Sequence, residues 1–230
     1  MRNFLCIGHR GAKGLEPENT LRSIRKALEI GVDGVEIDVY FVDGQLVVIH
    51  DDTLERTTTG SGRVEEQTFD YLRSLDAGRG EKIPVLREVF EEVGGRAFIN
   101  IELKGGGTAG PVFELIREYE GKPGWKREDF LVSSFDLPEL GKLKGRGIRL
   151  GTLFSRPPLD CVAIAKSLDA YSINIGSRAA DEALIGDAHA AGMKVFVYTV
   201  NSVREINKFR GMGADGIFTD YPDRALRPRK

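Results

Sequence analysis

The sequence predicts an α/β protein that folds as a (β/α)8 TIM barrel with a small insertion after the second strand. Short apolar runs alternate with amphipathic helical stretches through most of the 230 residues. Several of the runs end in acids, histidines or basic residues, and the carboxyl ends of strands are where α/β barrels place their active sites. The length and the 41% content of hydrophobic residues suit one large domain with a substantial core.

Nine apolar runs are candidate strands, centred near Leu5, Val35, Val47, Ile99, Leu131, Leu150, Ile173, Phe196 and Ile217. Nine is one more than the barrel needs, but only Asp43-Gly44-Gln45 separates the second run from the third. Asp-Gly between apolar residues predicts a tight hairpin, whereas a parallel crossover needs about a dozen residues or more. The run that ends at His50 should therefore fold back antiparallel on an extension of the second strand. Eight barrel strands remain.

Helices are expected where apolar positions recur with helical spacing. The seven candidate segments are 19–30, 86–93, 111–119, 136–144, 160–167, 180–191 and 203–211. We place Asn19 as the N-cap of the first helix, because an asparagine side chain there can accept a hydrogen bond from the first turn. Each barrel strand except the last is expected to precede a helix.

The segment 51–82 interrupts this alternation. It is rich in threonine, glycine, arginine and glutamate, and it holds one short helical pattern near 65–75. It is too long for a plain loop and too short for an independent core. We interpret it as an insertion in the second βα unit, packed over the C-terminal rim of a single barrel domain that spans residues 1–230.

Composition and charge exclude several classes of protein. The net charge of -2 argues against a nucleic-acid binder that works by bulk attraction to phosphate. No run approaches the roughly 20 apolar residues of a membrane span. The chain reaches His9 and Arg10 almost at once, which argues against a signal peptide. Cys6 in a candidate core strand and Cys161 at a helix start are interpreted as reduced packing residues, so a cytoplasmic location is expected.

Three acids on candidate strands suggest a metal site. Glu36 and Asp38 share one face of the second strand, because side chains alternate with period two, and Glu102 shares a face with Lys104 in the same way. Both faces of a parallel barrel strand are normally buried, and buried acids are costly unless they are paired or bound to metal. A salt-bridged or solvent-facing strand is the alternative. Carboxylates without a thiolate favour Mg²⁺ or Ca²⁺ over zinc.

Two of the three histidines end strands beside charged residues. His9 and His50 are therefore candidates for acid–base chemistry, because imidazole titrates close to neutral pH. His189 lies within a candidate helix, where a solvent-exposed or packing role is expected. Arg10 and Lys104 add positive charge at the same rim, and arginine can bind a phosphate through two parallel hydrogen bonds.

Taken together, these residues resemble the glycerophosphodiester phosphodiesterase family, whose members are (β/α)8 barrel enzymes. The family pattern occurs in order as His9-Arg10-Gly11, Pro17-Glu18-Asn19-Thr20, Glu36-x-Asp38, His50-Asp51, Glu102-x-Lys104, Ser134-Phe135, Thr199-Val200-Asn201 and residues 216–222. The ordered set is far more specific than any single motif. One departure is Tyr198, which stands where the family usually has tryptophan. An aromatic wall is retained, so only the fit to the glycerol or the leaving group is expected to differ.

The resemblance implies a role for each group of side chains. His9 and His50 would form the acid–base pair, and the divalent metal, Mg²⁺ or Ca²⁺, would be bound by Glu36, Asp38 and Glu102. The phosphate would be contacted by Arg10 and Lys104, with support from Glu18, Asn19 and Tyr198. The implied reaction is metal-dependent hydrolysis of a small-molecule glycerophosphodiester to sn-glycerol 3-phosphate and an alcohol such as choline, ethanolamine or glycerol. Either water or the substrate's own glycerol hydroxyl could be the nucleophile.

Three other functions compete with this one. A phosphodiesterase of the lysophospholipase D type would need an apolar groove at the rim, and the polar stretch 55–63 does not suggest one. A metal-dependent sugar-phosphate isomerase or aldolase would favour a catalytic lysine or base pair without a second strand-end histidine. A non-catalytic phosphodiester-binding protein would have little reason to keep both histidines and all three acids.

Overall fold

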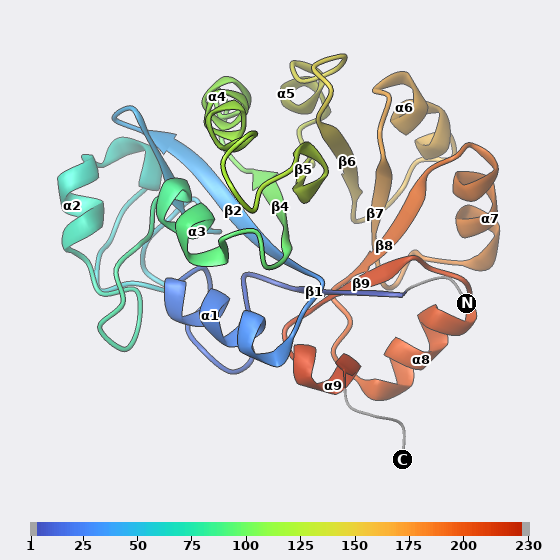
Figure 1. Ribbon diagram of the computed structural model, residues 1–230, viewed down its shortest axis with the longest axis horizontal. Helices are drawn as coiled ribbons and strands as arrows, with labels where there is room; N and C mark the ends of the chain where they lie inside the picture. The colour runs from blue at the N-terminus through green and yellow to red at the C-terminus, as the bar shows by residue number, and fades with distance from the viewer. Residues whose placement is uncertain (1–3, 227–230) are drawn as a thin grey trace.

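Eight parallel strands close into a barrel at the centre of the computed structural model, which describes residues 4–226 (Figure 1). The barrel strands are β1 (Leu5–Gly8), β2 (Gly34–Val42), β4 (Phe98–Leu103), β5 (Phe130–Ser134), β6 (Arg149–Phe154), β7 (Ser172–Gly176), β8 (Lys194–Tyr198) and β9 (Gly216–Thr219). Each strand pairs with the next along the chain, and β9 pairs with β1 to close the ring. The predicted (β/α)8 fold is confirmed.

The ninth strand, β3 (Gln45–Val48), pairs antiparallel with the end of β2 in the register Val42 to Gln45 and Val39 to Val48. Asp43 and Gly44 both have positive φ, at 48° and 75°, as a two-residue hairpin turn of this kind requires. The predicted hairpin is confirmed. It carries the chain from the turn at the carboxyl end of β2 back to the level of Asp38, whose carbonyl accepts a hydrogen bond from the Ile49 amide, so His50 arrives at the mouth of the barrel.

The helices that connect the barrel strands pack around the outside of the barrel (Figure 1). They are α1 (Leu21–Ile30), α3 (Leu86–Val93), α4 (Ala109–Tyr119), α5 (Leu137–Gly141), α6 (Cys161–Ser167), α7 (Glu182–Ala190) and α8 (Val203–Gly211). Each lies within or close to its predicted segment. Among residues 4–226, no helix is long and apolar enough to cross a membrane.

Two expectations about the helices were wrong. Thr20, and not Asn19, is the N-cap of α1, because Thr20 has the extended backbone that a cap needs and accepts a hydrogen bond from the Ser23 amide. Asn19 has a φ of 56°, and its buried side chain instead donates to Asp38. The last strand is also followed by a short helix, α9 (Pro222–Leu226). Proline suits a first helical position, since the amide it lacks has no partner there.

The insertion forms a 3₁₀ turn, η1 (Val64–Glu66), and a short helix, α2 (Phe69–Ser74). In Figure 1, α2 lies outside the ring of barrel helices, beside the far end of β2. Apolar side chains of the insertion share one cluster with the hairpin, formed by Tyr40, Val42, Val47, Ile49, Leu54, Val64, Leu72, Leu75, Ala77 and Ile83. Asp43 in the hairpin turn accepts a hydrogen bond from the Phe69 amide. The long hairpin therefore supplies the surface on which the insertion packs.

Candidate active site

Three carboxylates meet inside the carboxyl end of the barrel. Asp38 on β2 is the direct neighbour of Glu102 on β4, and oxygens of Glu36, Asp38 and Glu102 all lie within 4.8 Å of one another. Alternation along β2 causes this arrangement, because Ile37 and Val39 join the apolar cluster that the barrel shares with its helices. The acids between them therefore face the interior, and all three are buried.

The surroundings of these acids fit a divalent cation. Burial and the neighbouring carboxylates raise the pKa of Glu36 well above its ordinary value and the pKa of Glu102 to about 7. One oxygen of Glu36 and one of Asp38 are buried without a hydrogen-bond partner, which is costly unless another group satisfies them. A cation beside these oxygens would remove both costs. A site of carboxylate oxygens suits a hard ion such as Mg²⁺ or Ca²⁺.

We expect the pH dependence of stability to report on this site. In the metal-free protein, the pKa of Glu36 and the pKa of Glu102 are raised above the ordinary value of 4.5. The contribution of these shifts to the free energy of unfolding is fully present below pH 4.5. It is lost as the pH rises through the raised pKa values, which for Glu102 is about 7. A bound dication stabilises the ionised acids, so the increase in Tm caused by Ca²⁺ or Mg²⁺ should be larger at pH 8 than at pH 5. Thermal unfolding at both pH values, with EDTA and with added metal, measures this increase in Tm. Equal increases at the two pH values would contradict a metal site made of these acids.

His9 lies directly after β1 and is oriented by Asp220, which follows β9. Its Nδ1 is 2.6 Å from Asp220 Oδ1, and Asn201 donates to the other oxygen of that carboxylate at 2.7 Å. Burial opposes the charge on Asp220, but its hydrogen bonds to His9 and Asn201 and the nearby positive charges together outweigh burial and lower the pKa of that carboxyl, so Asp220 is ionised and can only accept. The proton of neutral His9 therefore lies on Nδ1, and its Nε2 points toward Glu36, 3.9 Å away.

His50, after β3, is oriented by Asp51 in the same way. Nδ1 of His50 is 2.5 Å from Asp51 Oδ1, so the second ring nitrogen is free to exchange a proton. Burial lowers the pKa of both His9 and His50, although hydrogen bonds to Asp220 and Asp51 oppose that shift. Both rings are therefore neutral near pH 7, as an acceptor of protons needs to be.

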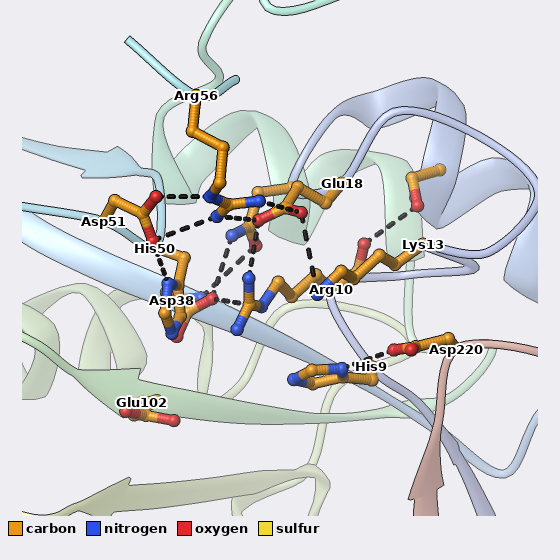
Figure 2. Close-up of polar contacts among 12 residues, drawn as sticks. His9, Arg10, Lys13, Glu18, Asp38, His50, Asp51, Arg56, Glu102 and Asp220 are labelled. Atoms are coloured by element: carbon orange, nitrogen blue, oxygen red, sulfur yellow. Dashed lines mark hydrogen bonds and ion pairs between the residues drawn. The ribbon is translucent and has the colours of Figure 1, made fainter. Parts of the chain in front are cut away.

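Arg10 and Lys104 place positive charge beside the carboxylates. Figure 2 shows Arg10 between Glu18 and Asp38, with Nη1 at 2.6 Å from Glu18 and Nε at 3.3 Å from Asp38. Lys104 Nζ lies 2.9 Å from Glu102 and 3.8 Å from Asp38. Burial opposes the charge on Lys104, but the two acids outweigh it and raise its pKa. Both cations are thus held charged at the mouth of the barrel.

These side chains surround a cavity of about 210 Å³, which is lined by His9, Arg10, Glu36, His50, Asn100, Glu102, Phe135, Leu153, Tyr198, Thr199 and Phe218. Its charged wall comes from β1, β2 and β4 and from the end of the hairpin, and its apolar wall from the other side of the barrel. The rings of Phe135 and Tyr198 meet edge to face at 6.0 Å. The cavity therefore suits a small molecule with an anionic group at one wall and an apolar part at the other.

The structure brings the sequence-derived candidates together. Six of them line the cavity, and the other four contact those six or one another: Asp38, Lys104, Glu18 and Asn19. His189 lies outside this set and bonds Asp215 at 2.7 Å, which agrees with a packing role.

Three residues that contribute to the site were not singled out from the sequence. Asp220 follows the last strand, so the rule that singled out His9 could also have found it. Asn100 lies two positions before Glu102 on the same strand face, but an amide carries no charge to draw attention to it. Arg56 lies in the polar insertion, where no periodicity distinguishes it from its neighbours. It contacts Asp51 and Glu18.

Comparison with known proteins identifies the relatives of this chain. The sequence model of the glycerophosphoryl diester phosphodiesterase family matches residues 9–224. A glycerophosphodiester phosphodiesterase of Caldanaerobacter subterraneus subsp. tengcongensis is 35% identical over 235 residues, which cover 95% of each chain. One from Bacillus altitudinis is 36% identical over 244 residues and 97% of each chain.

Solved structures agree with the sequence comparison. A phosphodiesterase of Oleispira antarctica, solved in complex with its product sn-glycerol-3-phosphate, superposes with a TM-score of 0.88 at 33% identity. The match covers 96% of this chain and 94% of that one. The glycerophosphodiester phosphodiesterase of Thermotoga maritima gives a TM-score of 0.78 at 29% identity, with 97% of each chain covered.

Proposed function

The chain belongs to the glycerophosphoryl diester phosphodiesterase family and is therefore a phosphoric diester hydrolase, and from this premise we propose that it hydrolyses glycerophosphodiesters to sn-glycerol 3-phosphate and an alcohol. The observation that carries the proposal is one site in which three buried carboxylates lie beside two histidines, each oriented by an aspartate. The similarity to a phosphodiesterase solved with sn-glycerol-3-phosphate supports the same product.

Glu36, Asp38 and Glu102 would hold Mg²⁺ or Ca²⁺. The oxygens of Glu36 and Asp38 that lack a hydrogen-bond partner support this assignment. When bound, a divalent cation neutralises charge on the phosphate and polarises the attacking oxygen. Asn19 donates to Asp38 at 2.9 Å and keeps that carboxylate directed toward the other two.

His9 and His50 would transfer the protons. One neutral ring takes a proton from the nucleophile at Nε2, and the other, which must first carry a second proton on Nε2, gives that proton to the leaving alkoxide and returns to the neutral form. Each Nδ1 donates to its aspartate, so Nε2 is the atom at which each ring would exchange a proton. The lowered pKa of both rings keeps the proton acceptor neutral near pH 7.

Arg10 and Lys104 would bind the phosphate. Arg10 lines the cavity, and its guanidinium donates a hydrogen bond to Glu18. Lys104 would act as a point charge, because an ammonium group lacks the planar fork of a guanidinium. Tyr198 would form part of the wall for the organic group, and its buried hydroxyl is unpartnered in the described structure.

Lysophospholipids are a second candidate substrate class, because the cavity has an apolar wall. Phe135, which is 47% exposed, extends that wall to the surface. The sequence suggested no apolar groove because that expectation considered only the polar stretch 55–63, whereas Phe135 follows β5 in a different part of the chain.

A panel of substrates tests the two classes. We expect release of glycerol 3-phosphate from glycerophosphocholine, glycerophosphoethanolamine and glycerophosphoglycerol, with kcat/KM well above that for cleavage of lysophosphatidylcholine to choline. Preference for the lysophospholipid would make it the substrate class, and no hydrolysis of any diester would overturn the proposal.

We propose that the insertion shapes the substrate site while the barrel remains the single folding unit. Replacing residues 57–79 with a short Gly/Ser linker removes no barrel strand, so closure of the barrel is retained. Val64, Leu72 and Leu75 leave their apolar cluster, so a lower Tm is expected, together with a higher KM or a changed preference for the alcohol. Thermal unfolding and kinetics on two diesters measure both effects. Loss of cooperative unfolding would contradict the single-unit assignment, and unchanged kinetics would contradict the role at the site.

We also propose that the protein works in the cytoplasm. Cys6 and Cys161 are both buried and unpaired, which suits a reducing compartment. The proposed partner is the small-molecule substrate.

A further inference from the structure

Arg56, in the insertion, contacts carboxylates that belong to two different parts of the site. Its Nη1 and Nη2 donate to the two oxygens of Glu18, each at 2.8 Å. Nη2 also donates to Asp51 Oδ1 at 3.0 Å, and Nε bonds the other oxygen of Asp51. Figure 2 shows the guanidinium between these two acids. A planar fork with five donors can bind two carboxylates at once in this way, which an ammonium group cannot.

Each of the two acids holds a residue of the proposed mechanism. Asp51 accepts from His50 Nδ1 at 2.5 Å. Glu18 accepts from Arg10 Nη1 at 2.6 Å. Arg56 is thus one step removed from a proposed proton-transfer group on one side and from a proposed phosphate ligand on the other.

We propose that Arg56 is a positioning residue that holds His50 and Arg10 in register through Asp51 and Glu18. The inference rests on the proposed two-histidine phosphodiester hydrolysis. It assigns the insertion an electrostatic part in the reaction, exerted through Asp51 and Glu18, in addition to shaping the substrate site.

Charge sharing explains why the contact matters for phosphate binding. The Glu18 carboxylate is shared among Arg10, Arg56 and Lys13, which lies 3.7 Å away. Burial disfavours the charge on Glu18, but its hydrogen bonds to Arg56 and Arg10 outweigh this and lower its pKa to about 2. Without Arg56, that negative charge would be compensated mainly by Arg10, whose positive charge would then be less available to a phosphate.

The same contact explains an effect on proton transfer. Asp51 follows β3 in the chain, and its side chain is a quarter exposed, so burial alone does not hold its carboxylate against His50. Arg56 bonds both Asp51 oxygens and so fixes the plane of the carboxylate. Small errors in the placement of a reacting group are costly in rate. A single exposed ion pair, by contrast, contributes little to stability.

The test compares Arg56 with Arg63, a matched residue of the same insertion. Arg56 and Arg63 are 47% and 52% exposed, and Arg63 also contacts two acids, Asp52 and Glu66. In metal-loaded protein, Arg56→Ala should lower kcat about 10- to 100-fold, the usual cost of losing a group that orients a functional side chain. It should also raise KM and the inhibition constant of sn-glycerol 3-phosphate. Arg56→Lys should be intermediate, and Arg63→Ala should match wild type.

Added guanidinium ion separates positioning from a structural role. It should restore part of the kcat of Arg56→Ala and none of that of His50→Ala. If Arg56→Ala proves poorly folded in thermal unfolding, the Arg56→Lys variant decides instead. A folded lysine variant with wild-type kcat and KM would overturn the inference, and a folded one with reduced kcat and raised KM would support it.

The outcome also distinguishes this inference from the function on which it rests. An active wild type, an inactive His50→Ala and an Arg56→Ala indistinguishable from Arg63→Ala would overturn the role of Arg56 alone. A wild type that hydrolyses no glycerophosphodiester would overturn the proposed function and this inference with it.

Discussion

Replacement of either His9 or His50 by alanine should lower the turnover of a glycerophosphodiester by at least about a hundredfold, the usual cost of losing a positioned proton-transfer group. The two rings reach the same cavity by different routes, one at the end of barrel strand β1 and the other after the returning hairpin. Neither can replace the other, because each is oriented by its own aspartate. Steady-state kinetics of both variants at saturating substrate measure the loss.

His189 provides the control for this prediction. It is on α7 and bonds Asp215, which also accepts hydrogen bonds from Lys194 and from the Val195 amide. His189→Ala should therefore reduce stability somewhat and leave turnover nearly unchanged. If His189→Ala proved as damaging to turnover as His50→Ala, the assignment of function to the strand-end histidines would be wrong.

Removal of divalent metal should abolish activity, and Mg²⁺ or Ca²⁺ should restore it better than Zn²⁺. Without a cation, Glu36, Asp38 and Glu102 would repel one another, and the raised pKa of Glu36 and of Glu102 reflects the cost of keeping these buried neighbours ionised. The proposed ligands are all carboxylate oxygens, which Mg²⁺ and Ca²⁺ prefer. Dialysis against EDTA followed by addition of each metal measures the effect.

Asp38→Asn separates the metal site from the fold. The amide keeps the shape of the side chain and removes one ligand charge, so metal affinity should fall while the metal-free protein unfolds cooperatively at a similar temperature. Isothermal titration calorimetry of metal binding reports this affinity directly. Full turnover in excess EDTA after dialysis would refute metal dependence, and an unchanged affinity in Asp38→Asn would remove that residue from the site.

The strands and the ends of the strands could be predicted from the sequence. Apolar periodicity located every barrel strand, and Asp43-Gly44 set the hairpin apart from the eight. Since the carboxyl ends of parallel strands meet at one rim, residues far apart in the chain could be assigned to one site from the sequence alone. Glu36, Asp38 and Glu102 do lie together there.

Contacts that depend on side-chain direction could not be predicted in this way. Asn19 has the composition of a helix cap, but its positive φ turns the side chain inward to Asp38, and Thr20 takes the cap. Arg56 reaches Glu18 across 38 positions of the chain. No local pattern encodes that pairing, because it depends on how the insertion packs on the hairpin.

The most direct test of the central claim is ³¹P NMR of glycerophosphocholine incubated with the wild-type protein and Mg²⁺ or Ca²⁺, with a parallel sample in excess EDTA. We expect the diester resonance to be replaced by that of sn-glycerol 3-phosphate in the metal-containing sample and to persist in the chelated one. Phosphocholine as the product would show that the other ester bond is cleaved. An unchanged diester resonance in both samples would contradict the account.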